Sequence, residues 1–229
     1  MIKRLLIIPA RSGSKRVKKK NYKLFLNKPI IFYSIEAALK SRLFNKIHVS
    51  TESSVIKKLI KKKNIETDFM RSKKLADDKT GLLDVINFVY KEYKNKNFYF
   101  DEIWCMSACS PLINSSDLIK ISKISSYKKI VLTVREYSAP IEWALVLKRK
   151  NKIKFLNPET IKIRSQDIKK KYHDAGSLIV IPKKFLEKKN FSIDGNSIAY
   201  ILPKSRSIDI DDPEDWKIAE ALYKRAYDK

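Results

Sequence analysis

The chain has 229 residues, a length that suits one domain with a single core and at most one excursion. Its composition, 44% hydrophobic with only 4 glycines, excludes a fibrous or disordered chain. The charge is strongly positive, with 50 Lys and Arg residues against 25 Asp and Glu residues, but the lysines are spread along the whole chain. They form no single patch with interleaved aromatic residues, so we expect a solvated basic surface and no nucleic-acid partner.

Apolar runs alternate with amphipathic segments through most of the chain. We expect strands at residues 4–8, 46–50, 67–70, 102–106, 130–134 and 177–181. We expect helices from Pro29 through Leu43, from Ser53 or Ser54, over residues 82–94, from a cap at Ser116, and from a cap at Asp212 with Pro213 at its first position. This alternation predicts an α/β fold of three layers with a mainly parallel sheet.

In such sheets, ligands bind at the carboxyl ends of the strands. The loops that follow Ile8, Met70 and Met106 are therefore the candidate site.

Residues 137–172 interrupt the alternation. They contain Pro140, Pro158 and a basic hairpin-like run from Lys148 to Lys154, with few helix signals. An irregular segment of this length inside a compact domain is typically functional or part of an interface. We therefore expect residues 1–229 to form one domain, with residues 137–172 as a small protruding excursion.

Targeting and redox signals are weak. The apolar run after Arg4 ends at Pro9, too early for a secretory signal, and no stretch approaches the length of a membrane span. We expect a cytoplasmic protein with no membrane partner. Cys105 and Cys109 are then expected to be reduced, buried thiols, because a disulfide scaffold or a metal site would need more ligands nearby.

The loop after the first strand, Pro9 to Arg16, combines small residues with cations. Gly13 permits close approach, Ser12 and Ser14 can donate hydrogen bonds, and Arg11 and Lys20 supply positive charge. These features suit a triphosphate. The spacing is not that of a Walker A loop or of a dinucleotide fingerprint, so a plain basic surface loop remains the alternative.

Carboxylates cluster just before the last helix. In an extended segment, Asp209 and Asp211 point to the same side, where they could hold Mg²⁺ against phosphate oxygens. Asp212 is better explained as the helix cap. The alternative for the other two is that they are solvated.

Polar side chains are dense over residues 164–176. Arg164 could pair with a sugar carboxylate, and Gln166, Tyr172, His173 and Asp174 could bind hydroxyl or amide groups. The alternative is a polar loop leading into a strand.

Several motifs together resemble one enzyme family. The run I-P-A-R-S-G-S-K-R-x-x-x-K-N at residues 8–21 is similar to the opening motif of acylneuraminate cytidylyltransferases, and so are Lys28-Pro29-Ile30, Val49-Ser50-Thr51, Arg71 and Leu75-Ala76-Asp77-Asp78. The resemblance covers nearly the whole chain and implies a Rossmann-like nucleotidyltransferase fold. It also implies CTP-binding roles for Ala10, Arg11, Gly13, Ser14, Lys15, Lys20, Asn21, Arg71, Ser107 and Ser110.

One run departs from the family pattern. The family often carries a Gln-Pro-Thr-Ser-Pro-like run where this chain has Ser107-Ala108-Cys109-Ser110-Pro111. A serine at position 107 makes fewer contacts than a glutamine, which bears on the choice of sugar.

The resemblance implies a reaction and its catalytic residues. The anomeric hydroxyl of an acidic nine-carbon sugar attacks the α-phosphorus of CTP, and pyrophosphate leaves, with Mg²⁺ on Asp209 and Asp211. Arg11, Lys20 and Asp211 are the expected catalytic residues, with Asp211 or a metal-bound hydroxide taking the proton.

The run R-S-Q-D-x-x-x-x-Y-H-D-A-G, starting at Arg164, resembles the pseudaminic acid branch, with the legionaminic and N-acetylneuraminic acid enzymes as alternatives. Pro140-Ile141 and Ala144-Leu145 fit that branch, whereas Glu142-Trp143 departs from it. The excursion implies a homodimer in this family. Three other readings stay open: a nucleotidyltransferase with another base or sugar, a basic nucleic-acid-binding protein, and a non-catalytic relative.

Overall fold

A single six-stranded sheet organises the chain. A computed structural model describes residues 2–125, 128–188 and 191–227. The strand order is β10-β6-β9-β5-β1-β4. The strands are β1 (Arg4–Pro9), β4 (Lys46–Ser50), β5 (Glu102–Met106), β6 (Ile130–Glu136), β9 (Tyr172–Pro182) and β10 (Ser197–Ile201). Only β9 runs antiparallel to its neighbours in this sheet, which confirms the expected α/β fold with a mainly parallel sheet.

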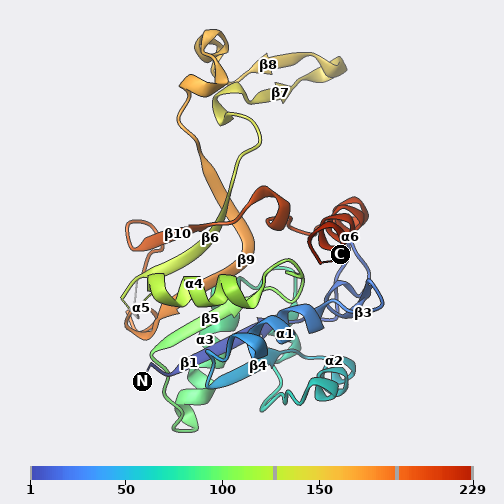
Figure 1. The fold of residues 1–229 in the computed structure, drawn as a ribbon, viewed down its shortest axis with the longest axis vertical. Coiled ribbons are helices and arrows are strands. Elements are labelled where there is room, and N and C mark those ends of the chain that lie inside the picture. The colour runs from blue at the N-terminus through green and yellow to red at the C-terminus, as the bar shows by residue number, and fades with distance from the viewer. Residues whose placement is uncertain (1, 126–127, 189–190, 228–229) are drawn as a thin grey trace.

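Helices cover both faces of the sheet (Figure 1). On one face lie α1 (Ile31–Ser41), α2 (Ser54–Ile60) and α4 (Ser115–Ser125), and on the other lie α3 (Leu82–Asn95) and α5 (Lys183–Leu186). Successive side chains of β1 point to opposite faces of the sheet and so pack against these two helix layers in turn. Leu6 and Ile8 join the first core and Leu5 and Ile7 join the second, and all four are fully buried. This division produces the three expected layers.

The last helix, α6 (Pro213–Tyr227), packs on a small third core. Two short paired strands, β2 (Leu24–Phe25) and β3 (Lys28–Pro29), complete this part of the chain. The rings of Phe25 and Trp216 meet edge to face at 5.6 Å. Asp212 caps α6 as expected, because its Oδ1 accepts hydrogen bonds from the backbone N–H of Glu214 and Asp215. The helix thereby fixes the position of the carboxylate segment that precedes it.

The expected strand at residues 67–70 is wrong. These residues are irregular and run beside β4 without forming a ladder with it. Side-chain contacts hold them instead, since Phe69 stacks on His48 at 4.4 Å between ring centroids and Tyr93 donates to Asp68. In the described sheet β4 is therefore an edge strand, with β10 at the opposite edge.

Two expected helix starts are also wrong. Pro29 lies in β3, and α1 begins only at Ile31. Ser116 lies inside α4, whose first turn is capped by Asn114. The Asn114 Oδ1 accepts from the backbone N–H of Asp117, and the Asp117 Oδ2 accepts from the backbone N–H of Asn114. Of the two serines expected as alternative caps of α2, Ser53 is the cap, because its hydroxyl accepts from the backbone N–H of Ile56, and Ser54 is the first residue of the helix.

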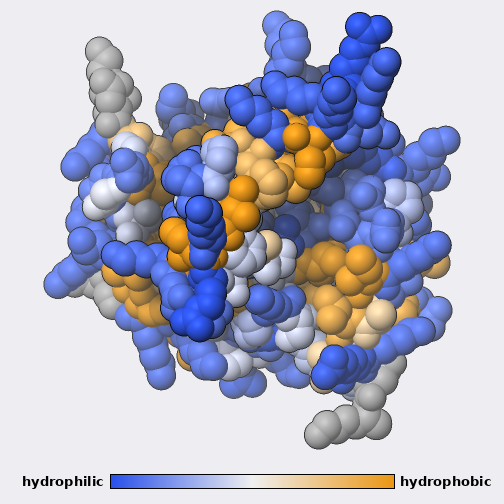
Figure 2. All heavy atoms as spheres, turned by 90° about the horizontal axis from the view of Figure 1, so that it is seen from above, coloured by the Kyte–Doolittle hydropathy of each residue, from blue (hydrophilic) through white to orange (hydrophobic). Residues whose placement is uncertain are grey.

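Residues 137–171 leave the sheet between β6 and β9 as an arm (Figure 1). Its outer part carries a two-stranded hairpin, β7 (Leu145–Leu147) and β8 (Ile153–Phe155). Apolar side chains of the arm are exposed, most of all Leu147 at 72%. Figure 2, which looks at the molecule from above, on the side of the arm, shows apolar surface among hydrophilic side chains. No helix within residues 2–125, 128–188 or 191–227 is long and apolar enough to cross a bilayer.

Candidate active site

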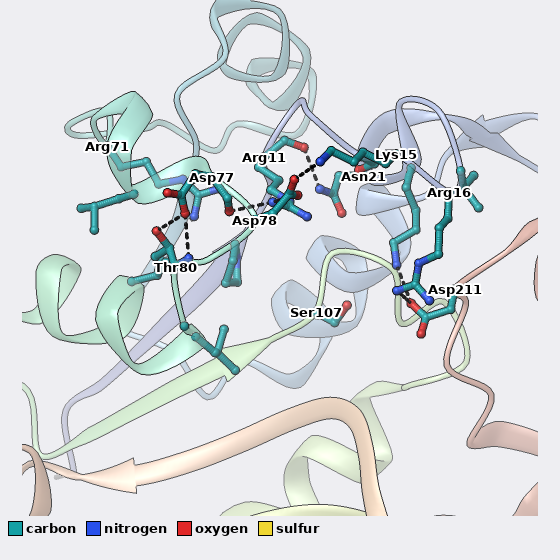
Figure 3. Close-up of a pocket in the computed structure, with 18 residues that line it drawn as sticks. Arg11, Lys15, Arg16, Asn21, Arg71, Asp77, Asp78, Thr80, Ser107 and Asp211 are labelled. Carbon is teal, nitrogen blue, oxygen red and sulfur yellow. Dashed lines mark hydrogen bonds and ion pairs between the residues drawn. The ribbon is translucent and has the colours of Figure 1, made fainter.

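A cavity of about 330 Å³ opens at the carboxyl ends of β1 and β5 (Figure 3). This is the edge of the sheet at which the sequence places the site. Its wall combines the loop after β1, the segment between residues 71 and 85, and single residues from two other loops. The lining residues are Pro9, Arg11, Ser14, Lys15, Arg16, Val17, Lys20, Asn21, Arg71, Leu75, Asp77, Asp78, Thr80, Gly81, Leu82, Val85, Ser107 and Asp211.

The loop after β1 is held in place by its own polar contacts. Asn21, which is buried, donates from Nδ2 to the backbone carbonyl of Arg11 at 2.8 Å. The Cys109 thiol donates to the Asn21 Oδ1 at 3.3 Å, so both ends of the amide are engaged. Burial raises the pKa of Cys109 to about 12, which keeps this thiol protonated and able to donate. The loop therefore presents its cations on a fixed backbone.

The cations of the loop form ion pairs on two sides of the cavity (Figure 3). Arg11 contacts Asp78 at 2.8 Å, and Lys15 pairs with the same carboxylate. Arg16 contacts the Asp211 Oδ1 at 2.8 Å, and the Lys20 Nζ lies 3.5 Å from the same oxygen. The four cations thus form ion pairs with two carboxylates that are both partly exposed. Arg11 also donates to the backbone carbonyl of Asp77 at 2.7 Å, and Lys20 to that of Ile210 at 2.6 Å.

A fifth cation, Arg71, lies in the floor and is 6% exposed. Its Nη2 is 3.6 Å from the Glu52 Oε2, and Glu52 also accepts from the backbone N–H and the hydroxyl of Ser12 at 2.7 Å each. Burial alone would raise the pKa of Glu52, but the hydrogen bonds from Ser12 and the charge of Arg71 lower it by more. The net effect is a lowered pKa, which keeps Glu52 ionised. Glu52 therefore joins Arg71 to the loop after β1, a link that the sequence did not reveal.

Of the two carboxylates expected to hold Mg²⁺, Asp211 lines the cavity and Asp209 does not. Burial and the nearby charge of Asp211 raise the pKa of Asp209, although the side chain remains open to solvent. Asp209 makes no hydrogen bond or ion pair among the described residues. A Cβ added at Gly176 would come within 2.9 Å of the Asp209 Oδ2, so the glycine leaves room for this carboxylate.

Two neighbouring carboxylates that repel one another fit a bound cation. Within the described parts of the chain, no group of three or more His, Cys, Asp or Glu side chains is placed to hold a metal. Mg²⁺ needs no such group, because it takes one or two carboxylates and fills its shell with phosphate oxygens and water. Asp209 and Asp211 therefore suit Mg²⁺ delivered together with a polyphosphate.

A second cavity of about 370 Å³ adjoins the first and shares Pro9, Leu82 and Ser107 with it. Its lining is mainly apolar, with a polar end at Asp174 and Gly176. The remaining lining residues are Leu83, Cys105, Ser177, Leu132, Leu178, Ile179 and Ile193. The two cavities together offer a charged compartment beside an apolar one.

The structure places some expected sugar-binding residues near this second cavity. Asp174 lines it, and its Oδ1 accepts from the backbone N–H of Gly176. His173 lies at the base of the arm, where its Nε2 accepts from the Arg135 Nε at 2.8 Å and its Nδ1 faces the Asp174 carbonyl at 2.9 Å. Since Nε2 accepts, the proton of the neutral ring is on Nδ1. Tyr172 is exposed at the start of β9.

Arg164 and Gln166 lie in the arm, away from both cavities of their own chain. Arg164 pairs with Asp167 at 3.0 Å, and Gln166 lines a separate groove with Tyr137 and Lys170. One chain by itself does not bring these two side chains to the site.

Three expected CTP-binding residues do not line the cavity. Ala10 and Ser110 are buried, and a Cβ at Gly13 would meet nothing within 4 Å. The sequence, in turn, assigned no role to Arg16, Asp78 or Glu52. For Asp78 a signal existed, because it is an acidic residue in a segment that had to face a cationic loop.

Comparisons with known proteins show which family the chain belongs to. A family model described as Cytidylyltransferase matches residues 5–129. A pseudaminic acid cytidylyltransferase of Campylobacter jejuni is 34% identical over 226 residues, which is 97% of each chain. A CMP-N,N'-diacetyllegionaminic acid synthase of Legionella pneumophila is 28% identical, with 95% of each chain covered. An N-acylneuraminate cytidylyltransferase of Escherichia coli is 29% identical, over 96% of this chain and 52% of that protein.

A solved CMP:2-keto-3-deoxy-manno-octonic acid synthetase in complex with CTP is similar in fold. Its TM-score is 0.69 at 15% identity, over 98% of this chain and 99% of that one. The family model covers more than half of the chain, and the C. jejuni relative matches nearly all of it. The chain therefore belongs to the cytidylyltransferase family.

Proposed function

We propose that this cytidylyltransferase transfers CMP from CTP to a nonulosonic acid, with pseudaminic acid as the preferred sugar, and releases pyrophosphate. The observation that carries the proposal is the cavity at the ends of β1 and β5, in which Arg11, Lys15, Arg16, Lys20 and Arg71 meet. Five cations in one compartment suit a triphosphate and exceed what a monophosphate needs.

The two cavities suggest where each substrate binds. The triphosphate belongs with the loop after β1, and the base belongs at the end lined by Leu75, Leu82 and Val85 beside the buried Arg71. The sugar then occupies the adjoining cavity, where the apolar wall suits acyl and methyl groups. In this placement Ser107, which is shared by both cavities, lies close to the bond that forms.

The residues of the loop lower the barrier by stabilising charge. Arg11 and Lys20 neutralise the charge that develops on the pyrophosphate as it leaves, while the fixed backbone around Asn21 keeps them in position. Asp209 and Asp211 would hold Mg²⁺, which supplies further charge neutralisation between the phosphates. Asp211 also serves as the expected acceptor of the hydroxyl proton.

The arm supports a homodimer. Leu145, Leu147 and Ile153 expose 48%, 72% and 57% of their surface on a two-stranded hairpin, an element that is marginally stable alone. A second copy of the chain would cover these side chains. It would also explain why Arg164 and Gln166 lie far from the site of their own chain, since they would serve the partner's sugar. We accordingly treat residues 1–229 as one domain with residues 137–172 embedded for dimerisation, and expect it to act in the cytoplasm.

The choice of sugar rests on the relatives. Two pseudaminic acid cytidylyltransferases of C. jejuni strains are each 34% identical to this chain. The legionaminic and N-acylneuraminic acid enzymes named above are 28% and 29% identical to it. The pattern that starts at Arg164 points to the same branch.

Pyrophosphate release with CTP and Mg²⁺ tests the proposal. Pseudaminic, legionaminic and N-acetylneuraminic acids are compared side by side, with UTP and GTP as alternative nucleotides. We expect release with CTP and pseudaminic acid. Release with another sugar would keep the reaction and change the substrate, and no release with any pair would refute the reaction.

The Asp211→Asn variant tests the role of that carboxylate. We expect turnover to fall at least about a hundredfold, because a group that stabilises charge at the reacting centre is lost. The matched control is Glu214→Gln, which removes an exposed carboxylate three residues away. Equal activity of the two variants would contradict the assignment, and their melting temperatures show whether both are folded.

A further inference from the structure

Asp78 lies where a ligand anion is expected. It is the shared partner of Arg11, at 2.8 Å, and of Lys15, and all three residues line the cavity (Figure 3). The loop after β1 carries these two cations for phosphate in the proposed function. In the structure the Asp78 carboxylate contacts both of them, and Arg11 also donates to the backbone carbonyl of Asp77 at 2.7 Å.

The segment around Asp78 is built so that its side chain can leave. The turn is closed by its neighbour Asp77, whose Oδ1 accepts from the backbone N–H of Lys79 and of Thr80 and from the Thr80 hydroxyl. Asp78 takes no part in that turn. Its side chain is 43% exposed, so rotation away from the loop brings it into water without unfolding the segment.

The carboxylate on the opposite side of the cavity, Asp211, has a different expected role from Asp78. There Arg16 and Lys20 pair with Asp211, a carboxylate that is expected to exchange these cations for Mg²⁺ when the nucleotide arrives. The carboxylate next to Asp78 is that of Asp77, and its Oδ1 is already engaged in the turn by Lys79 and Thr80. When Asp78 releases Arg11 and Lys15, no cation takes their place beside it. Breaking these two ion pairs therefore opposes the binding of the polyphosphate.

We propose that Asp78 is an internal counter-anion, which occupies the phosphate-binding cations Arg11 and Lys15 until a polyphosphate displaces it. The inference rests on the proposed function and adds a specificity-determining residue to it. A ligand must bring enough negative charge to compete with Asp78, which favours triphosphate and pyrophosphate over ligands with a single phosphate.

Inorganic pyrophosphate is the probe, because it tests the phosphate compartment independently of base and sugar. Isothermal titration compares the wild type with Asp78→Asn, which removes the charge, and Asp78→Glu, which keeps it. The matched control is Glu36→Gln, since Glu36 also pairs with two lysines, Lys28 and Lys63, but lies in α1 outside the cavity. Both neutral variants therefore change the net charge by the same amount.

We expect Asp78→Asn to bind pyrophosphate about three- to tenfold more tightly at low salt, the effect of releasing two partly exposed ion pairs. The gain should shrink as the salt concentration rises. Asp78→Glu and Glu36→Gln should bind within about twofold of the wild type. The KM for CTP should fall in Asp78→Asn, whereas a purely structural role would raise it or lower the melting temperature.

The outcomes separate the two proposals. If the wild type turns over CTP and Asp78→Asn binds pyrophosphate no more tightly than it does, the counter-anion role is overturned and the reaction stands. If Glu36→Gln gains as much as Asp78→Asn, net charge is the cause and the role of Asp78 is again overturned. If the wild type binds neither pyrophosphate nor CTP, both proposals fail.

Discussion

A buried histidine makes the fold sensitive to acid. His48 in β4 is 0% exposed and stacks on Phe69. The Tyr93 hydroxyl donates its one proton to the Asp68 Oδ2 at 2.6 Å, so the His48 Nδ1, 3.1 Å from the same hydroxyl, must be the donor to it. The Nε2 lone pair is then buried without a partner among the described residues. Protonation there would create a charged N–H with no acceptor, and burial lowers the pKa of His48 from 6.5 to about 4.

Because the pKa of His48 is lower in the folded chain than in the unfolded chain, acid destabilises the fold. The unfolded chain takes up the proton near pH 6.5, and the folded chain only near pH 4. The stability that depends on neutral His48 is therefore present above pH 6.5 and is lost as the pH falls toward 4. At about 1.4 kcal/mol per pKa unit, the difference between the two pKa values corresponds to about 3 kcal/mol, most of which is lost by pH 4.5.

The His48→Asn variant isolates this contribution. The amide nitrogen can take the place of Nδ1 as donor to Tyr93, and the side chain cannot be protonated. Urea unfolding followed by tryptophan fluorescence at pH 7.5 and pH 4.5 gives the free energy of unfolding of each protein. We expect the wild type to lose about 2.5 kcal/mol more than the variant between these pH values.

The chain's other histidine provides the control, because His173 is only partly buried, at the base of the arm. The His173→Asn variant should keep the acid sensitivity of the wild type. The reasoning would be refuted if His48→Asn lost as much stability on acidification as the wild type, since carboxylates would then account for the whole effect.

Three further predictions concern the site and the arm. Glu52→Gln should lower the free energy of unfolding by about 1–3 kcal/mol, because the buried Arg71 loses its charged partner; a melting temperature equal to the wild type would contradict this. Cys109→Ala should raise the KM for CTP roughly twofold to tenfold, while Cys109→Ser, which keeps a donor to Asn21, should not; equal values for both variants would rule out this role. Leu147→Asp should convert the proposed homodimer to a monomer in analytical ultracentrifugation without changing the far-ultraviolet spectrum, and a variant that remains dimeric would argue against the arm as the interface.

The sequence predicted the parts of the fold that local patterns determine. The apolar run in β1, the cap at Ser53 and the cap at Asp212 each depend on neighbouring residues, and each is confirmed. The strand expected at residues 67–70 failed because packing against His48 and Tyr93, which are distant in sequence, decides the conformation there. Pro29 suits a first helical turn locally, but its pairing with Leu24 takes it into β3.

In the candidate site, too, the features that depend on neighbouring residues could be predicted, and those that depend on distant residues could not. The cations of the loop after β1 could be predicted because one short motif carries them. Glu52 could not, because its role depends on Ser12 and Arg71, which the fold brings together from 40 residues before it and 19 residues after it. Ion-pair partners across such separations are set by the topology of the sheet.

The late position of β9 in the chain has a consequence for synthesis. This strand lies between β5 and β6 in the sheet, yet it ends at Pro182, well beyond both of them. While the chain emerges from the ribosome, one side of β5 stays unpaired until β9 has been made. Synthesis from the end of β5 at Met106 to the end of β9 at Pro182, at about 5–20 residues per second, takes roughly 4–15 s. A nascent chain stalled inside the arm would therefore expose a bare apolar strand edge, which is a site for aggregation or for capture by a chaperone.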